Sequence, residues 1–258
     1  MFNTHYIIEL LTPKLNKIEN IEANLDEFKK RYQKILSYNS IVSLPDNPMG
    51  NLRANAIETI DFLNLKTDPE KIILHLNTYH KKEDLDNFLE NAFKKDLKYL
   101  LVVTGDGNPW LPKLDPKEIG INTNTVTSIE LLKYIKKNYT DNFTLGVVFN
   151  QYEPINHEIT KLEKKIDAGA EFVITQPVIG GNSSLDLLYE HDLPIILGAW
   201  MSKNIDLLYK CIGKEREDQE YDPVENLKKL HELYPESTIF LSLLPFNQDW
   251  EKILPKFK

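Results

Sequence analysis

TLGVVF at Thr144–Phe149 and FVITQPV at Phe172–Val178 are two apolar runs of strand length. Between them, apolar side chains recur at helical spacing over Ile159–Ala168, among lysines and acidic residues. Runs rich in Val, Ile and Leu, without polar alternation, are typical of parallel strands that are buried on both faces. The stretch from Thr144 to Val178 therefore predicts a β-α-β unit, in which a helix connects two parallel strands.

The same alternation extends over the whole chain of 258 residues. Six further strand-length runs lie at Tyr6–Leu11, Ile41–Leu44, Ile72–Leu76, Tyr99–Thr104, Pro194–Trp200 and Thr238–Pro245. Further amphipathic segments at helical spacing lie at Leu25–Leu36, Leu85–Phe93, Ile129–Ile135 and Val224–Leu233. This alternation of strands and helices predicts an α/β fold, a single (β/α)₈ TIM barrel over residues 1–258. An open doubly wound sheet is the alternative, although no Gly-x-Gly-x-x-Gly turn follows the first strand.

Several helix starts and two long loops can be placed within this pattern. Asp84, Thr127 and Asp222 are residue types that cap helix N-termini, and each stands just before a helical segment. Residues 109–124 contain three prolines and predict a long loop after the fourth strand. Residues 214–221 predict a charged loop or helix end. Loops that follow barrel strands often bind ligands.

Composition limits the partners that we expect. The formal net charge is −8 and the pI is about 5.4, which argues against nucleic acid or an anionic membrane as a mainly electrostatic partner and favours a small molecule. Cys211 is the only cysteine, so a disulfide framework or a cysteine-rich metal site cannot be built. No basic segment followed by a long apolar one begins the chain, and no run reaches the roughly 20 apolar residues of a membrane span. We therefore expect a cytoplasmic protein.

Polar residues at the ends of the apolar strands are the first candidates for chemistry, because the loops after the strands build barrel active sites. Glu9 lies inside the run IIELL, where burial would raise its pKa and suit it to general acid work. An ion pair across the barrel is an equally good interpretation of Glu9. Asp106 stands between Gly105 and Gly107, which permit close backbone approach to a ligand. An Asp between two glycines is also common in turns that have no role in binding or catalysis.

Two other strand ends carry hydrogen-bonding side chains. His75 is flanked by apolar residues, where a structural histidine is more common than a ligand-binding one. Thr175 and Gln176 end the sixth strand, and an amide such as Gln176 offers both a donor and an acceptor to the edge of a heterocycle. The histidines show no paired metal-binding spacing, and no Gly-x-Ser-x-Gly elbow is found. We therefore expect neither a metal site nor a serine hydrolase.

The segment KIDAGAEFVITQ at Lys165–Gln176 has the pattern K-(V/I)-D-A-G-A…T-Q. With this segment, and in motif order over nearly the whole chain, the sequence resembles the methylenetetrahydrofolate reductase family of flavin-dependent (β/α)₈ barrels. The other matching motifs are Glu9 before a Thr-Pro pair, Ser43 with Asp46–Gly50, His75, Gly105-Asp106, and Pro194 with Gly198.

The resemblance implies a reaction, with roles for the residues that match. Glu9 would be the general acid that protonates the bridging nitrogen of methylenetetrahydrofolate, and Asp106 would stabilise the developing cation near the flavin. Gln176 and Thr175 would bind the folate or pterin substrate. The positions implied for cofactor binding, of FAD or FMN, are His75, Ser43, Gly105, Asp106, Tyr152, Lys164 and Lys165. Hydride transfer from the reduced flavin would give the 5-methyl product.

The electron donor stays open among NAD(P)H, ferredoxin and a partner redox subunit, as does homo-oligomer formation. Two departures from the family pattern keep other functions open. Thr104 stands where the family often has Arg before Gly-Asp, and Phe149–Pro154 replaces a Tyr-Pro-Glu-x-His pattern. The alternatives are a flavin-free or deazaflavin-using relative and a non-catalytic folate-binding partner subunit.

Overall fold

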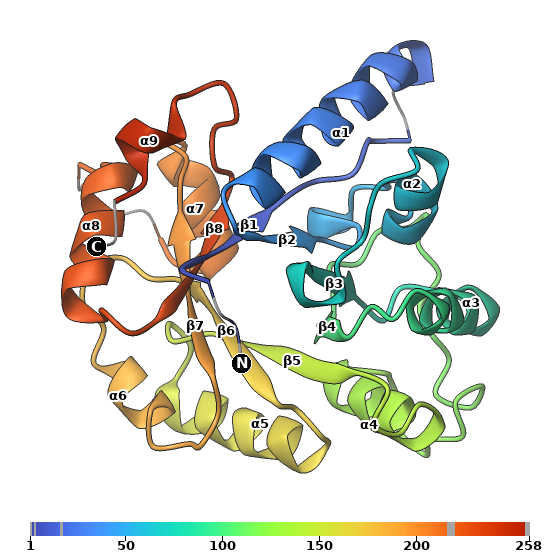
Figure 1. Cartoon of the computed structure of the whole chain (residues 1–258). Helices are drawn as coiled ribbons and strands as arrows, with labels where there is room; N and C mark the ends of the chain where they lie inside the picture. Colours follow the sequence, from blue (N-terminus) through green and yellow to red (C-terminus); the bar gives the residue numbers. More distant parts are fainter. Residues whose placement is uncertain (1, 3, 16–17, 216–219, 256–258) are drawn as a thin grey trace.

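The computed structural model describes residues 2, 4–15, 18–215 and 220–255. Its centre is a closed barrel of parallel strands in the order β1 to β8, with β8 pairing back onto β1 (Figure 1). The strands are β1 (Tyr6–Glu9), β2 (Ile41–Leu44), β3 (Ile72–Leu76), β4 (Tyr99–Val102), β5 (Thr144–Phe149), β6 (Phe172–Pro177), β7 (Ile195–Trp200) and β8 (Thr238–Ser242). The predicted (β/α)₈ barrel and its eight strands are confirmed.

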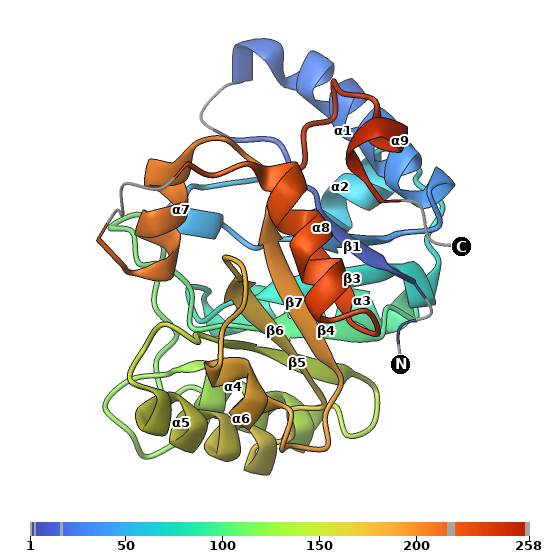
Figure 2. The same cartoon turned by 90° about the vertical axis from the view of Figure 1, so that its left-hand side faces the viewer.

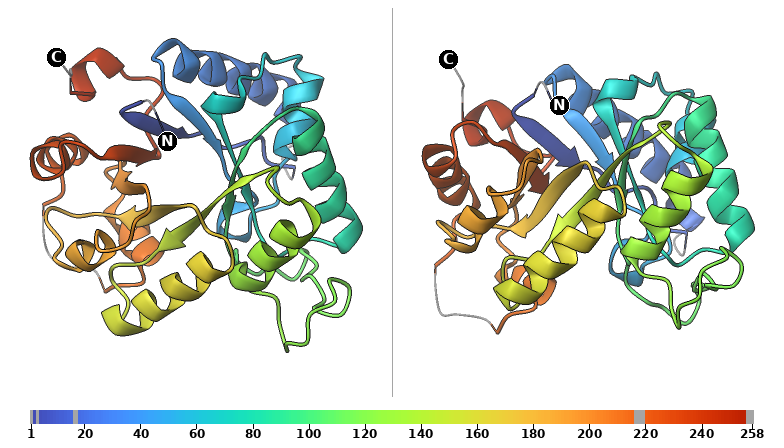
Figure 3. Two further views of the ribbon diagram at one scale, coloured as in Figure 1. Left: turned by 60° about the horizontal axis from the view of Figure 1, so that its bottom comes forward. Right: turned by 90° about the horizontal axis from the view of Figure 1, so that it is seen from below.

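Helices cover the outside of the barrel (Figures 1 and 3). They are α1 (Ile21–Ser37), α2 (Ala56–Phe62), α3 (Lys82–Lys94), α4 (Ser128–Asn138), α5 (Ile155–Asp167), α6 (Ser184–Leu188), α7 (Ile205–Ile212), α8 (Pro223–Leu233) and α9 (Trp250–Ile253). Short 3-10 turns lie at Ile18–Asn20, Pro48–Gly50 and Pro69–Lys71. Helix α7 lies at the opposite end of the barrel from the two termini (Figure 2). No helix within the described ranges is both long enough and apolar enough to cross a membrane.

Two of the predicted helix starts are confirmed, and one is wrong. Thr127 caps α4 in a capping box with Glu130, and the Asp222 side chain accepts two backbone N–H groups at the start of α8. Asp84 does not precede its helix, because α3 already begins at Lys82 and Asp84 lies in its first turn. The carboxylate there still complements the positive end of the helix dipole.

The barrel interior is packed by large side chains that alternate with the outward-facing ones along each strand. The interior cluster consists of Ile7, Ile41, Ile73, Tyr99, Leu101, Phe172, Ile174, Ile196 and Phe240. Gly146 on β5 leaves room for this cluster, because a Cβ atom there would lie 2.1 Å from the Phe172 ring. Gly198 on β7 is required for a similar reason, since its Cβ would lie 2.7 Å from the Thr175 carbonyl oxygen. The barrel is therefore a packed core, and only its ends are open to ligands.

Candidate active site

Four polar side chains form the last interior layer at the C-terminal end of the barrel. Each lies two residues after an interior apolar residue, so the strand alternation points it inward. These four are Glu9 on β1, Ser43 on β2, His75 on β3 and Gln176 on β6. The register pairs Glu9 directly with Ser43. Four of the residues proposed from the sequence are thus brought together at one end of the barrel.

Glu9 is the acidic member of this layer, and its side chain is half-buried. Burial raises the pKa of Glu9 to about 7, although the Leu243 N–H and the Arg53 charge act in the opposite direction. The Leu243 N–H donates to Glu9 Oε2 at 3.3 Å. Arg53 is held nearby, because its guanidinium donates to the Thr12 carbonyl and its N–H donates to Asn47 Oδ1 at 2.8 Å. A carboxyl group with this pKa keeps a large protonated fraction at neutral pH and can give up its proton.

His75 is held as a neutral side chain next to this acid. Its Nε2 lies 2.7 Å from the Ser43 hydroxyl, and its ring packs against Phe240. Burial lowers the pKa of His75 to about 4, against an opposing effect of the Asp46 charge. His75 therefore offers hydrogen bonds to a ligand without adding a positive charge at neutral pH.

The mouth of the barrel holds a cavity of about 430 Å³, lined by Met49, Asp106, Gln176, Lys210 and Cys211. We call it the mouth cavity. It brings the predicted Asp106 and Gln176 together, and its volume is in the range of small-molecule sites. Lys210 and Cys211 come from α7, which the sequence analysis did not place. The charges of Glu9 and Asp106 both act on the Cys211 thiol, and with burial, the largest cause, they raise its pKa.

The rim of the mouth is built by loops that hold one another. Asp106 Oδ2 accepts the Met49 N–H at 2.9 Å, and the Asn108 side chain donates to the Gly50 carbonyl at 2.7 Å. Gly105 has a φ of 79°, and a Cβ atom there would lie 2.7 Å from the Asn77 Cβ. A side chain at position 105 would therefore push apart the loops that follow β3 and β4.

A polar cluster behind the rim, which the sequence analysis did not identify, joins the same loops. His80 Nε2 lies 2.6 Å from Asp46 Oδ2, which also accepts the Asn77 N–H at 3.0 Å. Burial alone would lower the pKa of His80, but its hydrogen bond and ion pair with Asp46 outweigh burial and raise it. The bond between His80 and Asp46 therefore ties the loops after β2 and β3 together.

Four of the proposed residues belong neither to the inward-facing layer, nor to the rim, nor to the lining of the mouth cavity. Thr175 points away from the interior, and its hydroxyl accepts the Gly198 N–H at 2.9 Å. Tyr152 donates its hydroxyl to the Pro177 carbonyl at 2.8 Å. Lys165 is buried and donates to the Val148 carbonyl at 2.6 Å, whereas Lys164 is exposed on α5. Thr175, Tyr152 and Lys165 are thus bonded to the barrel wall instead of lining the mouth.

A flavin therefore fits this end of the barrel only in part. Ser43, His75, Gly105 and Asp106 offer hydrogen-bonding and carboxylate groups where a planar ring system could lie. The other three positions proposed for cofactor binding, Tyr152, Lys164 and Lys165, are bonded elsewhere or exposed on a helix. No group of three or more His, Cys, Asp or Glu side chains in the described part of the chain could hold a metal ion.

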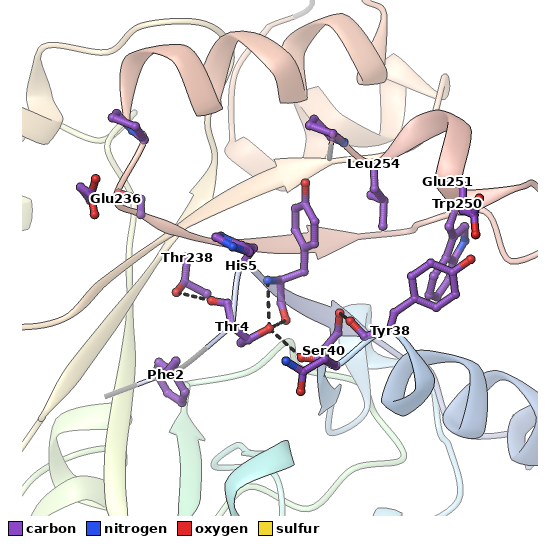
Figure 4. A pocket seen from close by; sticks show the side chains of 15 residues that line it. Phe2, Thr4, His5, Tyr38, Ser40, Glu236, Thr238, Trp250, Glu251 and Leu254 are labelled. Carbon is purple, nitrogen blue, oxygen red and sulfur yellow. Dashed lines mark hydrogen bonds between the residues drawn. The ribbon is translucent and has the colours of Figure 1, made fainter. Parts of the chain in front are cut away.

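The N-terminal end of the barrel holds a larger cavity, of about 620 Å³, which we call the N-terminal cavity (Figure 4). Its lining includes Thr4, Tyr38, Thr238 and Trp250. The Thr4 hydroxyl donates to the Asn39 carbonyl at 2.9 Å, and the Thr238 hydroxyl donates to the Thr4 carbonyl at 3.0 Å. These hydroxyl groups close the seam between β1, β2 and β8, so they serve the fold at an end where barrels do not place catalysis.

A closed parallel barrel with an acid and polar side chains at the C-terminal strand ends has the organisation of a (β/α)₈-barrel enzyme. Comparison with known families then identifies the group within this class. Residues 3–183 match the methylenetetrahydrofolate reductase family, and the chain belongs to this family. The resemblance inferred from the sequence motifs is thus confirmed.

Two yeast relatives and one solved structure illustrate the similarity. The chain is 32% identical over 99 residues to methylenetetrahydrofolate reductase 2 of Saccharomyces cerevisiae, covering 36% of this chain and 16% of that protein. It is 24% identical over 193 residues to the protein of the same name from Schizosaccharomyces pombe, covering 67% and 28%. The matched regions thus span less than a third of either relative. A dihydropteroate synthase from Vibrio fischeri has the same fold, with a TM-score of 0.52 at 13% identity, covering 92% of this chain and 86% of that one.

Proposed function

We propose that the chain is an oxidoreductase that reduces the methylene group of 5,10-methylenetetrahydrofolate, or of a related tetrahydropterin, to the methyl level. The observation that carries the proposal is the position of Glu9, which points inward at the C-terminal end of β1 beside Ser43. Burial there raises the pKa of its carboxyl group to about 7. Ring opening of the substrate requires a proton donor at neutral pH, and a carboxyl group with this pKa meets this requirement. Family membership supports the same reaction.

Glu9 acts as the general acid in this proposal. It gives its proton to the bridging nitrogen of the substrate, which opens the five-membered ring and leaves a cationic iminium group. The Leu243 N–H and the Arg53 charge lower the pKa of Glu9 against the effect of burial, so they stabilise the carboxylate that remains. The chain thus provides both the proton and the environment for the resulting negative charge.

Asp106 and Gln176 orient and stabilise the substrate in the mouth cavity. The Asp106 carboxylate lies at the rim and attracts the positive charge that develops as the ring opens. The Gln176 amide, pointing inward from β6, offers a donor and an acceptor to the pterin edge. Thr175 has no such role in this proposal, because its hydroxyl is bonded to the neighbouring strand.

Ser43, His75, Gly105 and Asp106 would hold the ring system of FAD or FMN, which supplies the hydride when it is bound. The electrons would come from NAD(P)H, ferredoxin or a partner redox subunit, and the place of action would be the cytoplasm. The decisive experiment is an absorption spectrum of the purified protein before and after addition of FAD or FMN. We expect a flavin spectrum that reductant bleaches and methylenetetrahydrofolate restores. A protein that binds neither flavin would contradict the proposed cofactor.

The internal bonds of Tyr152 and Lys165 favour one alternative, a relative that uses deazaflavin or no bound flavin. Such a protein would keep Glu9 as the acid and take its hydride from a diffusible donor. It would reduce the methylene pterin with reduced deazaflavin or NAD(P)H while showing no flavin absorption. Turnover that depends strictly on added FAD or FMN would exclude this alternative.

A further inference from the structure

Two of the described residues adopt a backbone conformation that does not suit their side chains. Among the described residues, the non-glycine residues with positive φ are Asn39, Asn47, Met49, Asn64, Asp96, Asp141 and Leu243. Asn and Asp tolerate the left-handed region, whereas bulky side chains adopt it only when the surrounding structure holds them there. Met49 and Leu243, each with a φ of 55°, are therefore the two unexpected members. Strained backbone of this kind is concentrated at functional sites.

Each of these two residues donates its N–H to one of the two candidate catalytic carboxylates. Leu243, directly after β8, donates to Glu9 Oε2 at 3.3 Å. Met49, in the turn after β2, donates to Asp106 Oδ2 at 2.9 Å. The other five left-handed residues are of types that adopt this conformation readily, so their conformation needs no functional explanation. Both residues with an unusual backbone conformation thus donate to a candidate catalytic carboxylate, which indicates that they have the same role.

The surroundings explain how the strain is kept. The Met49 side chain is 44% exposed, so packing of this side chain does not force the conformation. The turn is fixed instead by its neighbours, where Asn108 holds the Gly50 carbonyl and the Asn51 N–H donates to the Pro48 carbonyl at 3.2 Å. Leu243 is held by packing of its side chain against the cluster around Trp200.

We propose that Met49 and Leu243 are positioning residues for the proposed reaction, whose left-handed backbone holds one N–H on each catalytic carboxylate. The catalytic role in this inference rests on the proposed function. The test does not, because it measures titration in the ligand-free protein. An N–H that donates to Glu9 Oε2 disfavours a proton on that oxygen, so the transferable proton resides on Oε1. After transfer, the same N–H stabilises the negative charge on the carboxylate. At Asp106 the Met49 N–H fixes the direction of the charge that faces the iminium group.

The charged groups that act on this site include Arg53, which acts on Glu9, and Lys210, which lowers the pKa of Cys211. Arg53, from the loop after β2, lowers the pKa of Glu9, and Cys211, from α7, feels the charges of both Glu9 and Asp106. Cys211 is the only cysteine in the sequence. Its alkylation rate as a function of pH therefore reports on both carboxylates without any need for turnover.

The test compares substitutions that accept the left-handed conformation with substitutions that reject it. Leu243→Gly keeps the N–H and accepts a positive φ, whereas Leu243→Val is β-branched and rejects it. We measure the unfolding stability of the ligand-free protein from pH 5 to pH 9, and the part of its pH dependence that Glu9→Gln abolishes reports the titration of Glu9 by linkage. Leu243→Val should raise the Glu9 midpoint by about one pH unit relative to Leu243→Gly, because it loses a hydrogen bond to the ionised form.

Met49→Gly and Met49→Val form the second pair, at a site where little packing is lost. We expect the pH at which Cys211 alkylation is half-maximal to differ between the two variants and to be unchanged in Met49→Gly. Asn64→Val is the control, because it places the same strain at an exposed left-handed residue away from the mouth. It should lower stability and leave both midpoints unchanged.

The outcomes separate this inference from the proposed function. Equal Glu9 midpoints in Leu243→Val and Leu243→Gly, or equal Cys211 midpoints in the Met49 pair, would overturn the positioning role of that residue. If Leu243→Val does not fold, Leu243→Ala, which also disfavours a positive φ, takes its place in the comparison with Leu243→Gly. In an active enzyme each Val variant should also turn over about tenfold more slowly than its Gly partner. A wild-type protein without reductase activity would refute the proposed function. The titration results for Glu9 and Cys211 would still hold.

Discussion

The two ends of the barrel differ in how their polar groups are satisfied. The N-terminal cavity, at about 620 Å³, is larger than the mouth cavity, at about 430 Å³. Its hydroxyl groups on Thr4 and Thr238 nevertheless close the seam of the barrel through bonds to backbone carbonyls. At the mouth, Glu9 keeps a carboxyl group whose pKa lies near neutrality. Volume alone would therefore select the end opposite to the proposed site.

The two ends differ in backbone strain and desolvation as well as in cavity size, and strain and desolvation both favour the mouth as the functional end. Both carboxylates at the mouth accept an N–H from a strained residue, Met49 or Leu243. At the N-terminal end the left-handed Asn39 belongs to a residue type that accepts this conformation. At the mouth, strained backbone positions the N–H groups of Met49 and Leu243 at a cost in folding free energy. At the N-terminal end, the hydrogen bonds close the barrel.

The largest effect that we expect is on catalysis at the mouth. Glu9→Gln removes the transferable proton and keeps the shape of the side chain. Turnover should fall by about 10²–10⁴-fold, the usual contribution of a general acid. Steady-state kinetics at pH 7 would measure it. A variant that keeps more than a tenth of wild-type turnover would contradict the proposed role of Glu9 as the general acid.

Stability provides the control for Glu9→Gln. The pKa of Glu9 is raised from 4.5 to about 7 on folding, so the ionised carboxylate destabilises the folded state. The penalty is absent below pH 4.5 and grows until the pH passes about 7. Glu9→Gln should therefore match the wild type at pH 4 and exceed it at pH 8 by up to about 3 kcal/mol. A loss of turnover in a variant that is more stable cannot come from misfolding.

The next largest effect is on stability at the N-terminal end. Trp250 is fully buried, donates to the Pro245 carbonyl at 3.0 Å and packs against Tyr38. Trp250→Ala should cost about 3–5 kcal/mol of unfolding free energy. Turnover of the folded fraction and its pH profile should not change. Urea denaturation and kinetics below the unfolding transition would measure both quantities.

A matched control for Trp250→Ala is available on the surface. Phe62, at the end of α2, is 73% exposed, so Phe62→Ala should change stability by no more than about 0.5 kcal/mol. If Trp250→Ala instead shifted the pH profile of turnover, the two ends of the barrel would be coupled. The contrast between a catalytic mouth and a structural N-terminal end would then be wrong.

The strands could be predicted from the sequence because buried parallel strands are apolar almost throughout, as in Phe172–Val178. The four inward residues of the mouth also follow from alternation. Thr175 could have been rejected by the same rule, because it neighbours the inward Ile174 and Gln176 and must point the other way. The family motif did not supply this correction, because a motif records sequence order and not side-chain direction.

Other features could not be predicted because they depend on tertiary contacts. Helix α7 spans only Ile205–Ile212, too few turns for helical spacing to stand out, and it packs against the Trp200 cluster. Lys165 was proposed for the cofactor, but its side chain extends to the Val148 carbonyl of the neighbouring strand. Nothing in the residue types of Met49 and Leu243 predicts a left-handed backbone.

Asp106→Asn should have an intermediate effect and tests the charge at the rim. The amide oxygen can still accept the Met49 N–H, so the loop should keep its position while the negative charge is lost. Turnover should fall by about ten- to a hundredfold, because an electrostatic contact to the developing cation is removed. Rates at saturating substrate would measure this loss. An unchanged rate would make Asp106 a loop contact without electrostatic function.

The smallest effect should come from Arg53, whose charge lowers the pKa of Glu9. Because Glu9 acts in its protonated form, turnover should decline as the pH rises through about 7. Arg53→Gln removes the opposing charge, so the pKa of Glu9 should rise further and the decline should move to higher pH. We expect a shift of about half to one pH unit, with little change in the maximal rate.

Lys71→Gln is the matched control for Arg53→Gln, because it removes a positive charge from the N-terminal end, where Lys71 donates to Asn39 at 2.9 Å. Charges that far from the mouth are largely screened at physiological ionic strength, so the pH profile should stay that of the wild type. A pH–rate series at constant ionic strength would compare the two variants. A shift of equal size in both would mean that net charge, and not the placement of Arg53 beside Glu9, sets the proton affinity of the acid.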